Sequence, residues 1–337
     1  MLKKSLKDKD SKLHCNSGIS SEFVYHLSQV CHNIQSLIIE FERIISNGLT
    51  DLISFQKNLK CFIIKQYDKL KDTSLLLEKL PNTLSKLNLS RHNYVSLSFI
   101  ANFTNLKELE LSFDDSYYFE DFEKLQYAIF PKLQSLKIRR SCPKIELIIK
   151  FLENNGKNLR EFHVGDHEYD IRKINDNNNK NSLNLVIAKF CPNIRKLSTG
   201  FEKNELETLK IVLNDCKYLE SIRLCCYRKF LSDKVALEAI INYSQKVFHE
   251  LILEYFSDKE SKLLPEELES FLTNWKNRIP KRSLSLVVIT EECRVNSLDK
   301  DDENMKIINK YIKLGIIKKF KIVGFFDKEY GLWLELT

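Results

Sequence analysis

One short segment of the sequence gathers residues that could ligate a metal ion. Two imidazoles and three carboxylates lie close together there, in His163, Asp166, His167, Glu168 and Asp170. Histidine nitrogens and carboxylate oxygens are ligands that zinc takes in proteins. Short patterns of this kind also arise by chance where a strand end runs into a solvated loop. We expect the loop interpretation to hold and predict no metal site.

The glycine spacing excludes the nucleotide-binding and hydrolase motifs that depend on closely spaced glycines. The sequence holds eight glycines, and the closest two, Gly324 and Gly331, are seven residues apart. The GxGxxG fingerprint, the P-loop and the GxSxG elbow all need shorter spacings. HExxH and EF-hand spacings do not occur either. The sequence therefore predicts no catalytic residues, no cofactor and no enzymatic activity.

The composition is that of an ordinary folded protein. Hydrophobic residues make up 43% and charged residues 29% of the 337 positions, so a substantial core is available. No apolar run is long enough to span a bilayer, and the first residues, MLKKSLKDKDSK, do not lead into the apolar segment of a signal peptide. We therefore expect no membrane association and a cytoplasmic or nuclear location. The net charge of +7 is mild because 53 basic residues are interleaved with 46 acidic ones.

The cysteines are best explained as reduced packing residues. There are nine, an odd number, and no CxxC pair occurs among them. Cys31, Cys191 and Cys216 recur at one place in a repeated unit. This pattern favours buried thiols over disulfides or a zinc site.

The repeated unit has the form Asn-Φ-x-x-Φ-x-Φ, where Φ is apolar. It appears as CHNIQSLII from Cys31, as FTNLKELEL from Phe103 and as CPNIRKLST from Cys191. Each Φ-x-Φ alternates as a short half-buried strand does. The middle Φ of the eleven copies falls at Leu37, Phe62, Leu87, Leu109, Leu136, Phe162, Leu197, Ile222, Leu251, Leu284 and Phe320. The intervals run from 22 to 36 residues, and most lie close to the range of roughly 20 to 29 that is typical of leucine-rich repeats.

Apolar residues at three- and four-residue spacing predict helices between the strands. The predicted helices are 22–30, 120–129, 144–152, 183–190, 205–213, 234–241 and 304–314. Strand followed by helix, about eleven times, predicts an α/β leucine-rich-repeat solenoid, a horseshoe with its parallel sheet on the concave face. We expect a polar N-terminal tail over 1–20, the solenoid over 21–325 with an inserted loop at 175–182, and a C-terminal strand hairpin over 317–337 that caps the core.

The unit CPNIRKLST, with CHNIQSLII and CKYLESIRL, resembles the cysteine-containing leucine-rich repeats of F-box and related ribonuclease-inhibitor-like proteins. The resemblance covers residues 20 to about 325. It implies a substrate receptor of an SCF-type ubiquitin ligase, in which an F-box docks onto a cullin-ligase adaptor and the repeats hold the substrate. The residues ahead of Glu22 are few and mostly polar, so the F-box itself is not visible.

The outward x residue of each strand is where neighbouring repeats of a solenoid form one continuous binding surface. We expect these positions to bind a protein partner through a central basic patch of Lys137, Arg139, His163, Lys196 and Arg223. An exposed apolar pair, Ile38 and Ile63, is the competing site. The same residues also fit a merely solvated sheet surface. The sequence thus favours a non-catalytic protein-interaction scaffold, and the alternative is a nucleic-acid-associated basic solenoid.

Overall fold

The computed structural model describes residues 12–41, 45–67, 74–92, 96–165, 183–226, 229–256, 263–279, 281–290 and 297–324. The chain divides into two compact units. The first comprises Met1–Leu159 and His163–Asp170, and the second comprises Arg160–Phe162 and Ile171–Thr337. Within each unit the strands are neighbours in the order in which they occur in the chain.

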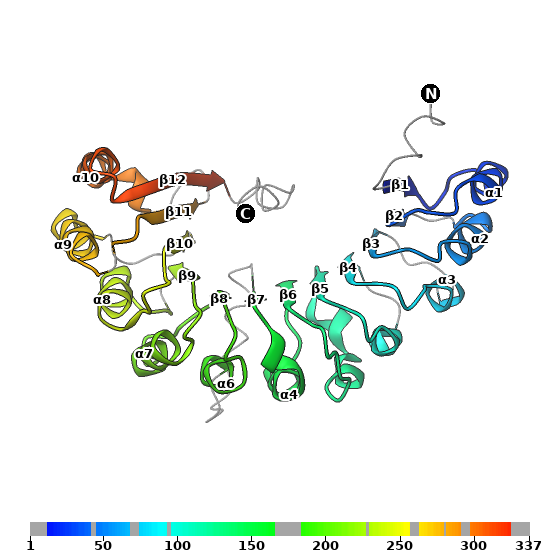
Figure 1. Ribbon diagram of the computed structural model, residues 1–337, viewed down its shortest axis with the longest axis horizontal. Helices are drawn as coiled ribbons and strands as arrows, with labels where there is room; N and C mark the ends of the chain where they lie inside the picture. The colour runs from blue at the N-terminus through cyan, green and yellow to red at the C-terminus, as the bar shows by residue number, and fades with distance from the viewer. Residues whose placement is uncertain are drawn as a thin grey trace. The chain divides into compact units, whose positions relative to one another are not determined.

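The first unit is a run of short parallel strands with a helix or a 3-10 turn after each (Figure 1). Its strands are β1 (Lys12–Asn16), β2 (Ser36–Phe41), β3 (Cys61–Gln66), β4 (Lys86–Arg91), β5 (Glu108–Phe113) and β6 (Ser135–Arg140). Its α-helices are α1 (Ser21–Val30), α2 (Gly48–Ser54), α3 (Ser74–Glu78) and α4 (Ile145–Asn155). Its 3-10 turns are η2 (Leu97–Asn102), η3 (Ser116–Phe119), η4 (Phe122–Leu125) and η5 (Gly156–Asn158).

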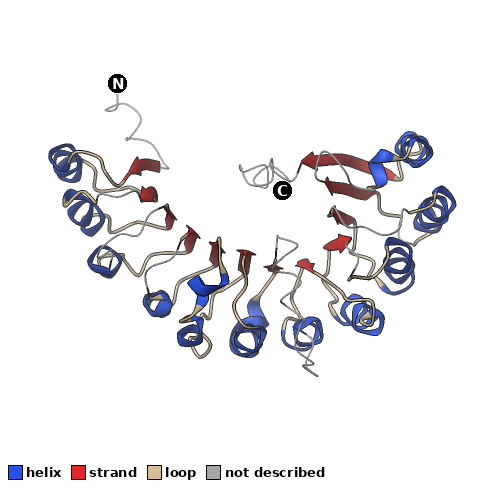
Figure 2. Ribbon diagram, turned by 180° about the vertical axis from the view of Figure 1, so that it is seen from behind, coloured by secondary structure: helices blue, strands red, loops and turns tan. Residues whose placement is uncertain are grey.

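The second unit repeats this alternation, again with parallel strands. The division between the units runs through β7 (Glu161–Val164). The strands of the second unit are β8 (Lys196–Thr199), β9 (Ser221–Cys226), β10 (Glu250–Tyr255), β11 (Leu284–Thr290) and β12 (Ile317–Gly324). Its helices are α6 (Leu183–Phe190), α7 (Leu206–Asp215), α8 (Asp233–Tyr243), α9 (Pro265–Lys276), η6 (Leu298–Lys300) and α10 (Asp302–Lys313). Within each unit the strands lie on one side and the helices on the other (Figure 2).

The core of each unit lies between strands and helices, and the predicted Φ residues fill it. Leu37, Phe62, Leu87, Leu109 and Leu136 are in register on β2 to β6, and each is at most 1% exposed. All eleven predicted strands are present. The register of β11 differs by two residues from the prediction, because Leu251 pairs with Leu286 and not with Leu284. A shift of two keeps the same face of a strand inward, so the core assignment is unaffected.

Two parts of the predicted organisation differ from the structure. Residues 12–16 form a twelfth strand, β1, parallel to β2, so the polar tail does not extend to residue 20. The segment 120–129, predicted as a helix, contains the short 3-10 turn η4, and Phe122 and Leu125 of this turn are buried. At the C-terminus, 317–324 form β12, which is parallel to β11. The rest of the predicted hairpin and the inserted loop at 175–182 lie outside the described residues.

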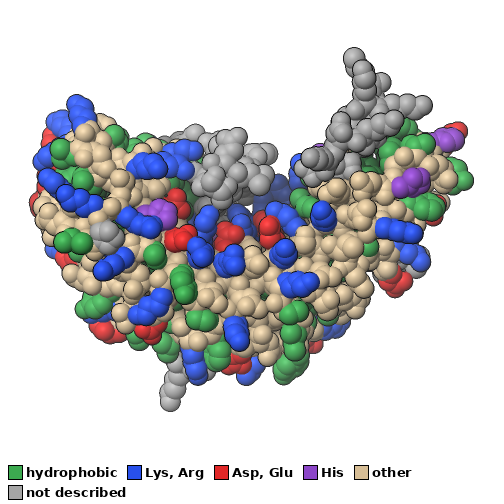
Figure 3. Space-filling view, in the orientation of Figure 1, with side chains coloured by type: hydrophobic (Ala, Val, Ile, Leu, Met, Phe, Trp, Pro, Cys, Tyr) green, Lys and Arg blue, Asp and Glu red, His purple; other side chains and the backbone are tan. Residues whose placement is uncertain are grey.

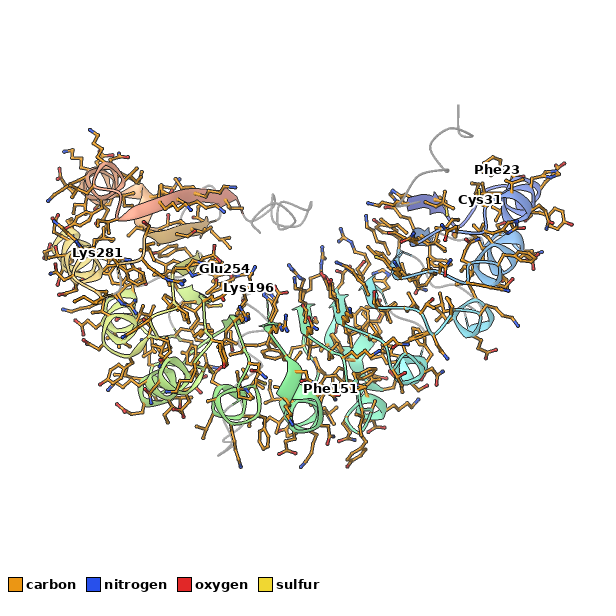
Figure 4. All side chains as sticks on the ribbon, viewed as in Figure 1. Phe23, Cys31, Phe151, Lys196, Glu254 and Lys281 are labelled. Atoms are coloured by element: carbon orange, nitrogen blue, oxygen red, sulfur yellow. The ribbon has the colours of Figure 1, made fainter. Side chains whose placement is uncertain are left out.

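Buried amide side chains join neighbouring repeats at the ends of helices. Gln56, after α2, accepts a hydrogen bond from the Ile34 N–H at 2.8 Å. Asn155, at the end of α4, accepts one from the Phe130 N–H at 2.7 Å and donates to the Ala128 carbonyl at 2.9 Å. Phe151, labelled in Figure 4, lies between α4 and the sheet with its ring 5.8 Å from that of Phe130. The hydrogen bonds of Gln56 and Asn155 satisfy backbone groups that would otherwise be buried without partners.

The structure offers no transmembrane candidate among the helices that it describes, because none of them is both long and apolar enough to cross a bilayer.

The recurring cysteines are packed inside the core, as predicted. Cys191 and Cys216 have no exposed surface, and Cys31 is 8% exposed. Burial raises the pKa of the Cys191 and Cys216 thiols from 9.0 to about 12, with a smaller contribution from neighbouring charge. The folded protein therefore holds these protons at pH values where the unfolded chain releases them.

We expect this difference to lower the free energy of unfolding as the pH rises above about 9, because the unfolded state then loses protons that the folded state retains. Below that pH the contribution is fully present. Urea unfolding at about pH 8 and about pH 10 measures the loss. A variant with Cys191→Ala and Cys216→Ala should lose less stability between the two conditions than the parent. Equal losses would contradict the assignment.

Candidate protein-binding face

The outward side chains of β2 to β6 form a surface of the first unit that we call the strand face. Neighbouring strands are about 4.8 Å apart, so residues in register make continuous rows. The central row is Ile38, Ile63, Asn88, Glu110 and Lys137. The strand face comprises this row and its charged neighbours Glu40, Lys65, Lys86, Glu108 and Arg139. Ile38 is buried and the other members of the central row are half-buried.

Each carboxylate of the strand face has a basic partner on an adjacent strand. The pairs are Lys65 with Glu40 (3.0 Å), Lys86 with Glu108 (2.8 Å) and Arg139 with Glu110 (3.0 Å). The hydrogen bond from Lys65 lowers the pKa of Glu40 even though burial opposes that shift. Burial alone would lower the pKa of Lys86, but the hydrogen bond and charge of Glu108 raise it. The carboxylates of Glu40, Glu108 and Glu110 are thus each paired with a basic side chain, and the strand face presents little uncompensated negative charge.

Two arginines end their strands in a left-handed backbone conformation. Arg91 closes β4 with φ +78° and Arg140 closes β6 with φ +64°. A left-handed conformation costs a non-glycine residue about 1–2 kcal/mol. At each site the next residue donates its N–H to the preceding strand, from His92 to Gln66 and from Ser141 to Phe113, both at 3.0 Å. Side chains kept in such a conformation are candidates for a functional role.

These arginines belong to a group at the carboxyl ends of β3 to β6 that we call the rim cluster, made of Tyr67, Arg91, His92, Asp114 and Arg140. The Arg140 guanidinium binds the Asp114 carboxylate, and His92 Nε2 lies 3.9 Å from the same group. The Arg91 guanidinium lies over the Tyr67 ring, with its carbon 5.9 Å from the ring centroid. Tyr67 is 42% exposed, so its side of this pair faces solvent.

The strand side of the second unit contains a buried ion pair. Arg223 on β9 and Glu254 on β10 are 1% and 0% exposed, and Arg223 Nε lies 2.9 Å from Glu254 Oε2. Arg223 Nη2 also binds Glu254 Oε1. The prediction that Arg223 is an exposed partner-binding residue is therefore wrong. Its guanidinium is occupied by a carboxylate that lies 31 residues away in sequence.

The other predicted site residues have mixed positions. Lys137 and Arg139 lie together on β6 in the first unit, whereas Lys196 is half-buried on the strand side of the second unit (Figure 4). His163 is 5% exposed, so its predicted outward exposure is wrong. Ile38 and Ile63 are neighbours in register, as predicted. Their predicted exposure is wrong for Ile38, which is 9% exposed between His14 and Ile63 of the adjacent strands.

The described part of the chain holds no metal cluster, and the face drawn in Figure 3 carries charges of both signs. Among these residues no group of three or more His, Cys, Asp or Glu side chains is placed to hold a metal ion. Except for His163, the candidate metal residues of the segment 163–170 lie outside the described ranges. On the face shown in Figure 3, Lys and Arg side chains are spread over the surface with Asp and Glu among them.

The rim cluster was not predicted from the sequence. Arg91, His92 and Asp114 follow the Φ-x-Φ unit by a few residues, and no motif marks them. The one feature of the sequence that could have indicated these residues is their position, since each ends or directly follows a predicted strand. The repeat pattern does not specify the left-handed φ of Arg91 or the approach of Arg140 to Asp114.

The strands, their parallel order and the buried Φ residues define the chain as an α/β leucine-rich-repeat solenoid. Two solved leucine-rich-repeat proteins are similar to it. The leucine-rich repeat-containing protein LegL7 from Legionella pneumophila is 13% identical, with 90% of this chain and 97% of that chain covered and a TM-score of 0.46. An internalin from Listeria monocytogenes is 13% identical, with 90% and 88% covered and a TM-score of 0.38. No protein-family model and no curated protein matches the sequence.

Proposed function

We propose that this protein is a non-catalytic interaction scaffold that binds an acidic segment of a partner protein through the strand face of the first unit. The observation that carries the proposal is the charge arrangement of that face. Its carboxylates are each paired with a lysine or arginine, while Arg91 of the adjoining rim adds a further positive charge. A chain with carboxylates therefore meets no uncompensated repulsion on the strand face.

The geometry supports a protein partner. The central row crosses five parallel strands, so its side chains offer about 19 Å of regularly spaced contacts. A single extended peptide of six or so residues covers that length. The row mixes two aliphatic, one amide and two charged side chains, which suits a polar peptide with an occasional apolar residue better than a uniform polyanion.

Lys137→Glu is expected to slow association with the partner and to flatten the salt dependence of its rate. The substitution reverses a charge at the β6 end of the central row, and steering depends on such charges. The partner is first identified by cross-linking from Asn88, and the association rate is then measured by surface plasmon resonance at several salt concentrations.

Lys150→Glu is the matched control, because it makes the same charge change on α4, at a side chain that pairs with Glu153 on the helix side of the unit. The proposal predicts a slower rate for Lys137→Glu alone. Equal effects of both variants would point to a long-range charge effect. Capture of RNA or DNA with a steep loss of affinity in salt would instead support the nucleic-acid alternative.

The more specific role that we propose is substrate recognition for an SCF-type ubiquitin ligase. Its support is the resemblance of CPNIRKLST and its relatives to the repeats of F-box proteins. In that role the acidic segment on the strand face belongs to the ligase substrate, and a cullin-ligase adaptor associates elsewhere. Recovery of adaptor and ubiquitinated partner together with the tagged protein would support this role, and a partner without either would contradict it.

A further inference from the structure

We propose that Arg91, held on the Tyr67 ring, is the anchor for a side-chain carboxylate of the partner's acidic segment. This inference rests on the proposed function, because the carboxylate belongs to the protein that the strand face binds. It adds a specificity-determining contact at the rim, where β4 ends.

The first observation is the state of the Arg91 side chain. No hydrogen bond or ion pair engages its guanidinium among the residues that the structure describes, and its contact is the Tyr67 ring at 5.9 Å. A cation within about 6 Å of a ring centroid is attracted to the face of the ring, and this attraction uses none of the guanidinium's N–H donors. A carboxylate matches two of these donors at once.

The second observation is the contrast with Arg140. Both arginines end strands in the left-handed conformation, with φ +78° and +64°. The Arg140 guanidinium forms an ion pair with Asp114, so its charge is compensated within the protein. Arg91 has the same unfavourable backbone without such an ion pair in the described structure. An external carboxylate supplies the partner that Asp114 supplies to Arg140.

The third observation is the charge around Arg91. The carboxylate of the rim cluster, Asp114, forms an ion pair with Arg140. The carboxylates of the strand face also form ion pairs with basic side chains. Tyr67 is exposed and Arg91 is half-buried, so a side chain entering from solvent reaches the edge of the guanidinium. The site is therefore both accessible and favourable for a negative group.

The test uses a fluorescein-labelled octaglutamate peptide as the probe and an octaglutamine peptide as the neutral control, with anisotropy measured at about 0.15 M salt, where the Debye length is about 8 Å. Arg91→Gln should raise the dissociation constant for octaglutamate by about tenfold, the effect of losing a charge-assisted bidentate pair. Lys150→Gln removes the same charge from the helix side and should change the constant by less than about twofold, since surface charges far from the site are screened. Arg91→Lys keeps the charge without the planar fork and should bind more weakly than the parent.

The outcomes separate this inference from the proposed function. Equal binding by Arg91→Gln and Lys150→Gln, or parent-like binding by Arg91→Lys, would overturn the Arg91 anchor. If Lys137→Glu weakened octaglutamate binding while Arg91→Gln did not, the strand face would stand without this anchor. If the parent bound octaglutamate no better than octaglutamine, both proposals would fail. Thermal unfolding of each variant confirms that the fold is intact.

Discussion

Arg223→Met is expected to destabilise the second unit by about 3–5 kcal/mol, because it leaves the Glu254 carboxylate buried without its counter-charge. Both side chains are at most 1% exposed, so water cannot replace the lost guanidinium without opening the structure. Urea unfolding followed by the fluorescence of Trp275, a buried residue of α9, reports on this unit.

The double variant Arg223→Met with Glu254→Met is the control for this result. A buried ion pair replaced by apolar side chains of similar size is often neutral or stabilising. The double variant should therefore recover most of the stability that the single variant loses. If Arg223→Met alone were as stable as the parent, Arg223 would not be paired inside the protein, and its predicted role as an exposed binding residue would be restored.

Leu109→Ala is expected to cost about 2–5 kcal/mol in the first unit, since it removes a fully packed strand side chain and leaves a cavity. Leu109 is 1% exposed and lies in register between Leu87 and Leu136. In a repeat array each repeat contacts only the adjacent repeats. Amide hydrogen exchange in Leu109→Ala should therefore rise first around β4 to β6.

Ile129→Ala is the matched control for Leu109→Ala, because it also shortens an aliphatic side chain but at a position that is 66% exposed. It should change the free energy of unfolding by less than about 0.5 kcal/mol. Exchange that increased uniformly along the chain in Leu109→Ala would contradict the repeat register.

The fold was largely predictable because the Φ-x-Φ pattern repeats. A buried residue such as Leu87 or Ile222 is specified by local alternation and by its recurrence in the next repeat. Where the pattern weakens, the prediction was wrong. The strand Lys12–Asn16 carries no preceding Asn-Φ signal, and its identity as a strand depends on pairing with β2.

The candidate site was harder to predict because it depends on pairings between distant residues. Alternation correctly placed Lys137 and Ile63 on the outward side of their strands, but it gave no information on what lies opposite. Arg223 is outward by alternation, yet Glu254 of the next strand buries and neutralises it. The left-handed φ of Arg91 is likewise not specified by alternation.

Site-specific photo-cross-linking from the two sides of the first unit tests whether a partner protein binds the strand face. A benzoylphenylalanine at Asn88, in the central row of the strand face, is compared with one at Tyr127, which is 72% exposed on the helix side. We expect one protein to cross-link to the Asn88 position in the parent protein, Lys137→Glu to reduce this product, and the Tyr127 position not to yield it. The same product from Tyr127 in equal or greater amount, or its persistence in Lys137→Glu, would contradict binding through the strand face.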